Sequence, residues 1–244
     1  MDSVEEDLSF RGNDPGASQY GNFINYYQFH PPDTRIRSLP NHLWNPPGND
    51  IEHCVALDIG CNSGELTTEL HSFLGQNSTW KSVSLLGIDI DPTLITRANG
   101  LKKEHVSFEC LNIMTEDANE KLQDYLDKIG KEKFDVIFCF SITMWIHMNF
   151  GDEGLIRFLD FICEKGRLLV IEPQPWKCYR NAVRRMKKSA NELFPLYDGL
   201  EIRHDVDSQI ENIVLRNKSF IKIHETFSSE WSRKLYFFKQ KDIS

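Results

Sequence analysis

The sequence lacks the marks of a membrane or secreted protein. None of its apolar runs approaches the roughly 20 residues of a membrane-spanning helix. Residues 1–7 are mostly acidic and do not show the order of positive, apolar and small residues that makes a secretory signal. We therefore expect a soluble, intracellular protein without a membrane partner.

Clustered cysteines are also missing. The six cysteines stand singly, many within apolar strand patterns, with no C-x-x-C pair and no cysteine and histidine cluster at zinc spacing. They are Cys54, Cys61, Cys110, Cys139, Cys163 and Cys178. The pattern predicts reduced thiols in the core and no bound metal.

An excess of positive charge is absent as well. The formal net charge is −8, from 28 basic and 36 acidic residues, which argues against a protein that coats nucleic acid with its whole surface. Any site for a polyanion must therefore be local. Segment 176–188 is the candidate, because it holds six basic residues and no acidic one.

At 100° per residue, segment 176–188 predicts an amphipathic helix. Its basic stripe contains Lys177, Arg180, Arg184, Lys187 and Lys188, and its opposite face contains Tyr179, Ala182, Val183, Met186 and Ala190. The basic stripe is either a solvated surface or a contact for phosphate groups. We favour phosphate contact, because the segment directly follows a strand end on the ligand side of the predicted sheet.

The first strand-to-helix turn lacks the dinucleotide pattern G-x-G-x-x-G. It instead reads Val55-Ala-Leu-Asp-Ile-Gly-Cys-Asn-Ser-Gly64, and a second apolar run, Leu86-Gly-Ile-Asp-Ile-Asp91, also ends in acidic residues. Glycines allow the backbone to turn tightly and approach a ligand, and open α/β sheets bind ligands beyond the carboxyl ends of their strands. A nucleoside with an amino-acid tail, S-adenosylmethionine, fits this spacing better than NAD.

The rest of the chain alternates apolar strand patterns with helical ones. Strands are predicted at about 54–59, 83–90, 106–111, 134–140 and 167–171, followed by a hairpin-like pair at 220–227 and 234–239. A helix is predicted at 151–164, and Asp91-Pro92 predicts an N-cap with proline in the first turn. Residues 1–19 are predicted to be a disordered polar terminus, and 20–244 a single domain with a lid segment at 20–50.

Several motifs together carry a specific resemblance. The most distinctive are Ser141-Ile-Thr-Met-Trp-Ile-His147 and Glu172-Pro-Gln-Pro-Trp-Lys177, and the others are Gly21-Asn-Phe, Tyr26-Tyr27, Arg35-x-Arg37, the turn at 57–64, Asp89-Ile-Asp91 and Gly151-Asp-Glu-Gly-Leu155. From Tyr20 to the C-terminal strands the chain resembles the Bicoid-interacting-3 family of RNA 5′-phosphate methyltransferases. The resemblance implies a Rossmann-like class I methyltransferase fold with a seven-stranded, mostly parallel sheet of order 3-2-1-4-5-7-6.

The family contains capping enzymes, which methylate a γ-phosphate, and cytoplasmic enzymes, which methylate a 5′-monophosphate. Capping enzymes have a lysine where this chain has Met144. The chain is therefore similar to the monophosphate group.

The cofactor residues are expected at the strand ends. Asp89 offers two acceptor oxygens to the ribose hydroxyls; Asp91 competes for that role, although its place before Pro92 suits helix capping. Asp58 either caps the next turn or organises the loop that faces the methionine moiety. The resemblance adds Tyr27, Arg35, Gly60, Cys61, Asn62, Ile90, Asn112, Ile113 and Phe140 as cofactor residues. Of these, Ile113 and Phe140 also suit a core position, and Arg35 is expected to pair with the cofactor carboxylate.

The acceptor side needs cations, because a 5′-monophosphate carries roughly −1.5 to −2 charge at pH 7. The candidates for positioning it are Arg37, Lys177 and Arg180 as cations and Tyr26 and Gln174 as neutral donors, with Trp176 stacking on the terminal base. Along the RNA backbone we expect Arg184, Lys187 and Lys188. His147 is a candidate general base, although a hydrogen-bonded structural role is the more common one for a lone histidine after apolar residues.

These patterns predict an enzyme that uses S-adenosylmethionine to methylate the 5′-monophosphate of a small RNA, such as a transfer RNA or a precursor microRNA-like hairpin. No obligate protein partner is evident. Two alternatives stay open. One is a small-molecule O-methyltransferase, which the basic segment disfavours, and the other is a catalytically silent RNA-binding scaffold, which the intact Asp58, Asn62 and Asp89 disfavour.

Overall fold

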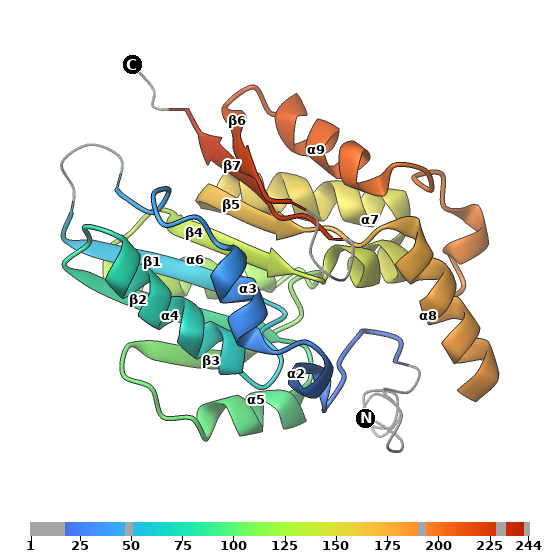
Figure 1. The fold of residues 1–244 in the computed structure, drawn as a ribbon, viewed down its shortest axis with the longest axis horizontal. Helices are drawn as coiled ribbons and strands as arrows, with labels where there is room; N and C mark the ends of the chain where they lie inside the picture. The colour runs from blue at the N-terminus through green and yellow to red at the C-terminus, as the bar shows by residue number, and fades with distance from the viewer. Residues whose placement is uncertain (1–17, 47–50, 190–193, 228–232, 242–244) are drawn as a thin grey trace.

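The computed structural model describes residues 18–46, 51–189, 194–227 and 233–241. Its centre is a seven-stranded sheet with the order β3-β2-β1-β4-β5-β7-β6 (Figure 1). The strands are β1 (His53–Ile59), β2 (Ser82–Asp89), β3 (Val106–Cys110), β4 (Phe134–Phe140), β5 (Gly166–Glu172), β6 (Phe220–Glu225) and β7 (Tyr236–Gln240). Strands β1 to β5 pair in parallel, and β7 runs antiparallel to both of its neighbours. The predicted fold class and strand order are confirmed.

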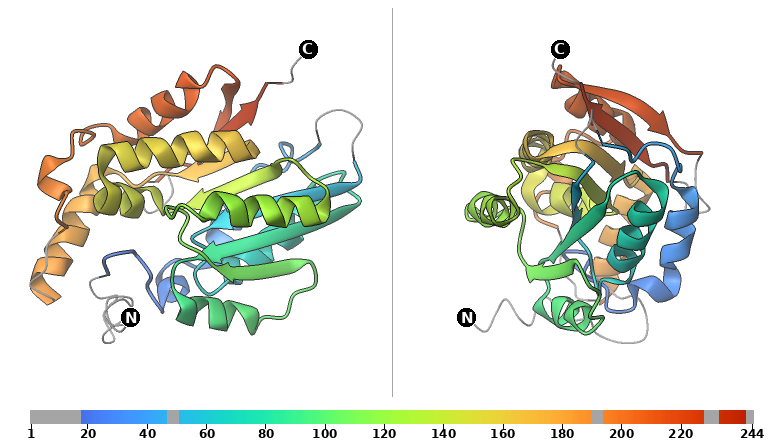
Figure 2. Two further views of the ribbon diagram at one scale, coloured as in Figure 1. Left: turned by 180° about the vertical axis from the view of Figure 1, so that it is seen from behind. Right: turned by 90° about the vertical axis from the view of Figure 1, so that its left-hand side faces the viewer.

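Helices cover both faces of this sheet (Figure 2). They are α2 (Tyr26–Phe29), α3 (Pro32–Ser38), α4 (Glu65–Asn77), α5 (Pro92–Asn99), α6 (Ala118–Ile129), α7 (Thr143–Lys165), α8 (Trp176–Ser189) and α9 (Val206–Arg216), with a short 3-10 helix, η1 (Tyr197–Gly199). Side chains of β1 alternate between two apolar cores: Val55 and Leu57 face α6, α7, α8 and α9, whereas Cys54 and Ala56 face α4. Central strands buried on both faces explain the continuous apolar runs that marked them in the sequence.

Helix α7 is longer than the predicted helix at 151–164. It begins at Thr143 and contains one non-helical residue, Gly151, with φ 72° and ψ −174°. Residues 143–148 are mostly buried, so this turn of helix has no polar face and gave no amphipathic signal. Part of the motif at 141–147 therefore belongs to a buried helix.

The N-terminal segment is more ordered than the sequence suggested. Residues 1–17 of the predicted disordered terminus lie outside the described residues, but Ser18 and Gln19 are placed, and the Gln19 carbonyl accepts a hydrogen bond from Asn149 Nδ2 at 2.8 Å. Part of the predicted lid at 20–50 belongs to the core. The Trp44 ring is 1% exposed and contacts the rings of Phe73, Phe138 and Phe237, which anchors this part of the segment against the sheet.

Two cysteine predictions are wrong. Cys110 is exposed because it lies on the edge strand β3, and Cys178 is half-buried on α8; the other four are buried, and all six are free thiols. Within the part of the chain that the structure describes, no helix has the length and apolar character needed to cross a membrane. Nor do the described side chains include a group of three or more His, Cys, Asp or Glu that could hold a metal ion.

Candidate active site

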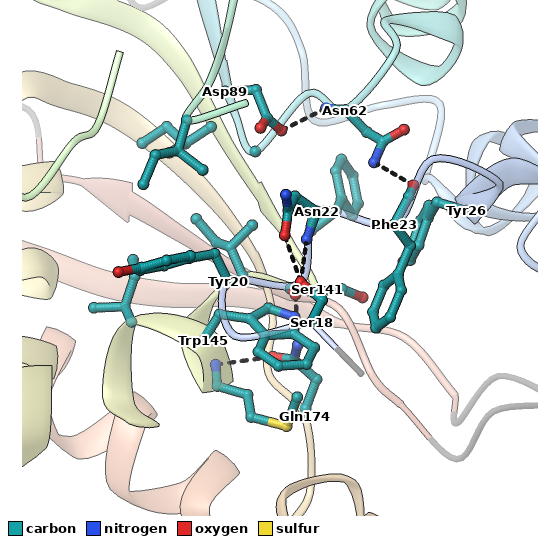
Figure 3. Close-up of a pocket in the computed structure, with 18 of the residues that line it drawn as sticks. Ser18, Tyr20, Asn22, Phe23, Tyr26, Asn62, Asp89, Ser141, Trp145 and Gln174 are labelled. Carbon is teal, nitrogen blue, oxygen red and sulfur yellow. Dashed lines mark hydrogen bonds between the residues drawn. The ribbon is translucent and has the colours of Figure 1, made fainter. Parts of the chain in front are cut away.

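A cavity of about 350 Å³ lies at the carboxyl ends of the parallel strands (Figure 3). The loops after β1, β2 and β3, the end of β4 and the segment after β5 supply one part of its wall, and α2, α8 and the loop before β7 supply another. The predicted site residues that line it are Tyr26, Gly60, Asn62, Asp89, Ile90, Asn112, Ile113, Phe140 and Gln174. The topology thus brings these nine residues to one cavity, at the position where open α/β sheets bind ligands.

Asp89 ends β2 with its carboxylate in the cavity wall. Its Oδ2 accepts the backbone N–H of Asn62 at 2.9 Å (Figure 3). Its Oδ1 accepts the backbone N–H of Asp91 at 3.0 Å. Burial raises the pKa of Asp89 to about 6, against the effect of these two N–H groups. A carboxylate has about four lone-pair sites, so each oxygen keeps one for a further donor.

Asp91 has the other predicted role. Its Oδ1 accepts the backbone N–H groups of Thr93 and Leu94 at 2.7 and 3.2 Å, which caps α5, and its Oδ2 accepts Asn22 Nδ2 at 2.8 Å. Asp91 does not line the cavity. Of the two acids at the end of β2, Asp89 is therefore the one available to a ligand.

The turn after β1 requires glycine where it meets the cavity. Gly60 has φ 78°, and a Cβ atom there would lie 2.3 Å from Ile142 Cγ2. Asn62 follows in the left-handed region at φ 52°, with its Nδ2 donating to the Phe23 carbonyl at 3.0 Å. The turn is thereby joined to the N-terminal segment that covers it.

Three predicted cofactor residues lie in or beside this turn but outside the cavity lining. Tyr27 donates its hydroxyl to the Cys61 carbonyl at 3.1 Å, and Asp58 Oδ2 accepts the Thr67 hydroxyl at 2.7 Å. Burial raises the pKa of Asp58 to about 7. Tyr27, Asp58 and Cys61 do not line the cavity, so their contacts are with the turn and with α4.

The position of Arg35 does not fit the prediction that it pairs with the cofactor carboxylate. Its side chain is 2% exposed, and its guanidinium donates to Glu172 Oε2 at 2.8 Å, to Ser141 Oγ at 2.9 Å and to the Tyr26 hydroxyl at 2.6 Å. The two guanidinium groups of Arg35 and Arg233 hold the pKa of the buried Glu172 carboxyl below its usual value. Because Arg35 is bound within this internal network and lies outside the cavity lining, it is not placed to pair with a cofactor carboxylate.

The three predicted phosphate cations do not line the cavity. Arg37 is exposed and pairs with Asp33, while Lys177 and Arg180 point to solvent from α8; none of the three lines the cavity. The basic side chains that do line it are His30, Arg185 and Arg233. One signal was available for Arg185: Cys178, Asn181, Ala182 and Arg185 follow helical i, i+3, i+4, i+7 spacing and form the cavity stripe of α8.

Arg233 is held over the end of β4 by a buried network. Its Nη1 donates to Ser141 Oγ and lies 3.7 Å from Glu172 Oε2, and its pKa is raised by Glu172. His30 lies in the same wall, and burial together with the charges of Arg233 and Arg35 lowers its pKa to about 4. At neutral pH this end of the cavity therefore contains two guanidinium groups and one neutral imidazole.

Trp176 and His147 have structural roles. The Trp176 ring stacks on Tyr179 and Tyr197, with centroids 4.7 and 5.3 Å apart, and is not in the cavity lining, so it is not placed to stack on a terminal base. His147 is fully buried, and its two ring nitrogens lie 3.0 Å from the Tyr179 hydroxyl and from Asp152 Oδ1. Its geometry fits the hydrogen-bonded structural role, not that of a general base.

Gln174 lines the cavity, but its amide is engaged at both ends. Its Oε1 accepts the Thr143 hydroxyl and the Met144 backbone N–H, each at 3.1 Å, and its Nε2 donates to the Ser141 carbonyl. Ser141 lies in the left-handed region with φ 58°. Gln174 therefore fixes the turn that presents Ser141 to Arg233.

Helix α8 shows the predicted division of faces. Tyr179, Val183 and Met186 are buried, whereas Arg184, Lys187 and Lys188 are exposed on the part of the helix that extends away from the sheet (Figure 1). Ala190, which was assigned to the apolar face, lies outside the described residues.

Comparison with known proteins agrees with this geometry. A general methyltransferase domain matches residues 57–168, and the sequence model of the Bicoid-interacting protein 3 (Bin3) family matches residues 134–240. A pre-miRNA 5′-monophosphate methyltransferase of Xenopus laevis is 39% identical, over 93% of this chain and 94% of that protein. The chain belongs to the Bin3 family.

Two other relatives show the breadth of the Bin3 family. A Homo sapiens RNA 5′-monophosphate methyltransferase is 38% identical, over 93% of this chain and 82% of that protein. A Drosophila melanogaster U6 snRNA methylphosphate capping enzyme is 30% identical, over 82% of this chain and 64% of that protein. The predicted family is confirmed, and this Bin3 member is a methyltransferase.

Proposed function

We propose that this Bin3 family member transfers a methyl group from S-adenosylmethionine to the 5′-monophosphate of a small RNA, such as a transfer RNA or a hairpin precursor. The observation that carries the proposal is one cavity with two chemically different ends. Asp89, Asn112 and Ile113 form a nucleoside-binding end, and Arg185 and Arg233 form a cationic end. The Xenopus laevis and Homo sapiens relatives are 5′-monophosphate methyltransferases, which supports the same reaction.

The residues at the first end fit an adenosyl group. Asp89 offers acceptor oxygens suited to ribose hydroxyls, the Asn112 amide suits the edge of a base, and Ile90 and Ile113 offer apolar surface. S-adenosylmethionine would supply a methyl group already activated by its sulfonium. The chain needs only to bind and orient the cofactor there, with no general base required.

At the second end, Arg185 and Arg233 would hold the oxygens of the phosphate that do not react. Two guanidinium groups match the roughly −1.5 to −2 charge of a monophosphate. Met144 is buried in the wall of the cavity and adds no further cation for a longer phosphate chain. Orienting the phosphate against the methyl donor can supply roughly 7–11 kcal/mol in well-aligned systems.

The test is the dependence of turnover on the 5′ end. RNAs of one sequence with a 5′-monophosphate, a 5′-hydroxyl or a 5′-triphosphate are incubated with labelled methyl donor, and their 5′ ends are analysed by mass. We expect efficient methylation of the monophosphate RNA alone. Equal turnover of the triphosphate would refute monophosphate specificity. Methylation of small phosphate metabolites but not RNA would favour the small-molecule alternative, and cofactor binding without any transfer would favour the silent scaffold.

We also propose that the basic face of α8 follows the RNA backbone, and that the reaction takes place in the cytoplasm as part of RNA processing. Changing Arg184, Lys187 and Lys188 together to Gln is expected to weaken RNA binding and to reduce the magnitude of its salt slope by about 2–3, at roughly 0.7–0.9 per lost phosphate contact. Cofactor affinity should not change, since all three side chains lie outside the cavity lining.

The matched control for α8 changes three exposed lysines outside this helix to Gln: Lys103, Lys128 and Lys218. This control variant carries the same change in net charge, so it separates a local contact from a general loss of positive charge. If both triple variants give the same salt slope, α8 is a solvated surface and not an RNA contact.

A further inference from the structure

Phe29 occupies an unusual place at the edge of the cavity. It is the last residue of α2, it lines the cavity, and its side chain is 50% exposed. Among the described residues that line the cavity, it is the one aromatic with an exposed side chain. A single exposed aromatic side chain is ordinary on a protein surface, but Phe29 is distinguished by the residues that surround it.

The cationic end of the cavity lies beside Phe29. His30 follows it directly, and Arg185 and Arg233 complete the same wall. The His30 ring lies 5.0 Å from the Tyr26 ring, and the Tyr26 hydroxyl accepts a hydrogen bond from Arg35. Arg35 and Arg233 both donate to Ser141 Oγ, so contacts link the end of α2 to Arg233. A phosphate bound there is joined to its own nucleoside by only a few bonds, so the first base must emerge close to this edge.

On α8, the residues that line the cavity adjoin the basic face of the helix. Asn181 lines the cavity, and its Oδ1 accepts a hydrogen bond from Arg184 Nη2 at 3.3 Å. Arg184 is exposed on the outer face of the same helix. A strand leaving the cationic end would therefore pass between α2 and α8 on its way to the basic face.

Three other aromatic side chains in or near the cavity already contact neighbouring rings or a guanidinium group. Trp176 stacks between other rings outside the cavity, as described above. The Tyr26 ring has no free face for stacking at the edge of the cavity, because it contacts Tyr27, His30 and the Arg35 guanidinium. Phe23 lies edge-on to Trp145, with ring centroids 5.8 Å apart, on the side of the cavity where Asn62 binds its carbonyl.

We propose that Phe29 is the stacking platform for the nucleobase of the first RNA nucleotide, in a role that rests on the proposed function. The ring holds the base at the edge while its phosphate reaches Arg185 and Arg233. Every base has a π-face, so the contact distinguishes an RNA end from a free phosphate metabolite without selecting one base.

The experiment is a cycle between protein and RNA. Wild type and Phe29→Ala are assayed on two 5′-monophosphate RNAs that differ only in whether the first nucleotide carries a base or is abasic. We expect either single change to lower kcat/KM by about 5- to 150-fold, which corresponds to about 1–3 kcal/mol, and the second change to add almost nothing. Phe29→Tyr should keep the activity, and Phe29→Leu should lose it despite its apolar side chain.

RNA affinity is measured for the same pairs of protein and RNA in the presence of S-adenosylhomocysteine. This second measurement does not require methyl transfer. Coupling in affinity without turnover would refute the proposed reaction and retain the platform, whereas turnover with additive losses would refute the platform and retain the reaction. Ile221→Ala, at a 43% exposed position on β6 outside the cavity lining, is the control and should leave both measurements unchanged.

Discussion

An Asp89→Ala variant is expected to lose detectable binding of S-adenosylhomocysteine. The carboxylate is buried in the cavity wall and would accept two ribose hydroxyls, and each hydrogen bond to a charged group is worth about 1.5–3 kcal/mol. Removing both predicts a loss of affinity of at least about a hundredfold. Calorimetric titration measures it directly, with the exposed Asp124→Ala as the control that keeps wild-type affinity.

Asp89→Ala also removes the acceptor of the Asn62 and Asp91 N–H groups, so the variant should melt at a lower temperature. Asp89→Asn keeps one acceptor oxygen and separates the ligand effect from the stability effect. Because the pKa of Asp89 is raised to about 6, wild-type affinity should fall as the pH drops through that value and the carboxylate is protonated. The Asn variant should show no such fall, and unchanged affinity in either variant would refute the ribose assignment.

The second large effect is expected at the cationic end. Arg233→Gln should lower kcat/KM for 5′-monophosphate RNA by roughly 10²–10³-fold, the cost typical of removing one preorganised group that stabilises transition-state charge. Cofactor affinity should stay at its wild-type value, because Arg233 contacts Ser141 at the end of β4, and β1 separates β4 from β2, which ends in Asp89. Initial rates at subsaturating RNA measure kcat/KM, and rates at saturating RNA show how much of the loss lies in kcat.

Two variants make the Arg233 result interpretable. Lys234→Gln changes the adjacent residue, which is half-buried, pairs with Glu225 and lies outside the cavity lining, so its turnover should match wild type. Arg233→Lys keeps the charge beside Glu172 but loses the planar fork, and should fall between wild type and Gln. An Arg233→Gln enzyme with normal turnover would move the phosphate to a different part of the cavity.

The nucleoside end could be predicted from the sequence because its residues are local to strand ends. Each one follows an apolar run, and the parallel arrangement places all strand ends at one edge of the sheet. Asp89 and Asp91 could even be told apart, since a residue before Pro92 is expected to cap a helix and Asp91 does so.

The cationic end could not be predicted in the same way. Arg233 reaches the cavity because β7 pairs with β5, and nothing in the residues around 233 indicates that placement. The density of basic residues on α8 indicated Lys177 and Arg180 as phosphate-binding cations, but both lie on its outer face. The stripe of α8 that lines the cavity contains a single arginine, Arg185. Arg35 was misassigned because its partner, Glu172, is 137 residues away in the sequence.

The insertion of β7 between β5 and β6 also constrains the order in which the molecule is made. During translation, β1 to β5 and the residues of the nucleoside end emerge before residues 236–240. The edge of β5 stays unpaired until β7 leaves the ribosome, and Arg233 cannot reach Ser141 before then. A nascent chain halted before Arg233 and β7 would contain the strand ends that line one part of the cavity, an unpaired edge on β5, and only one of the two arginines proposed to hold the phosphate.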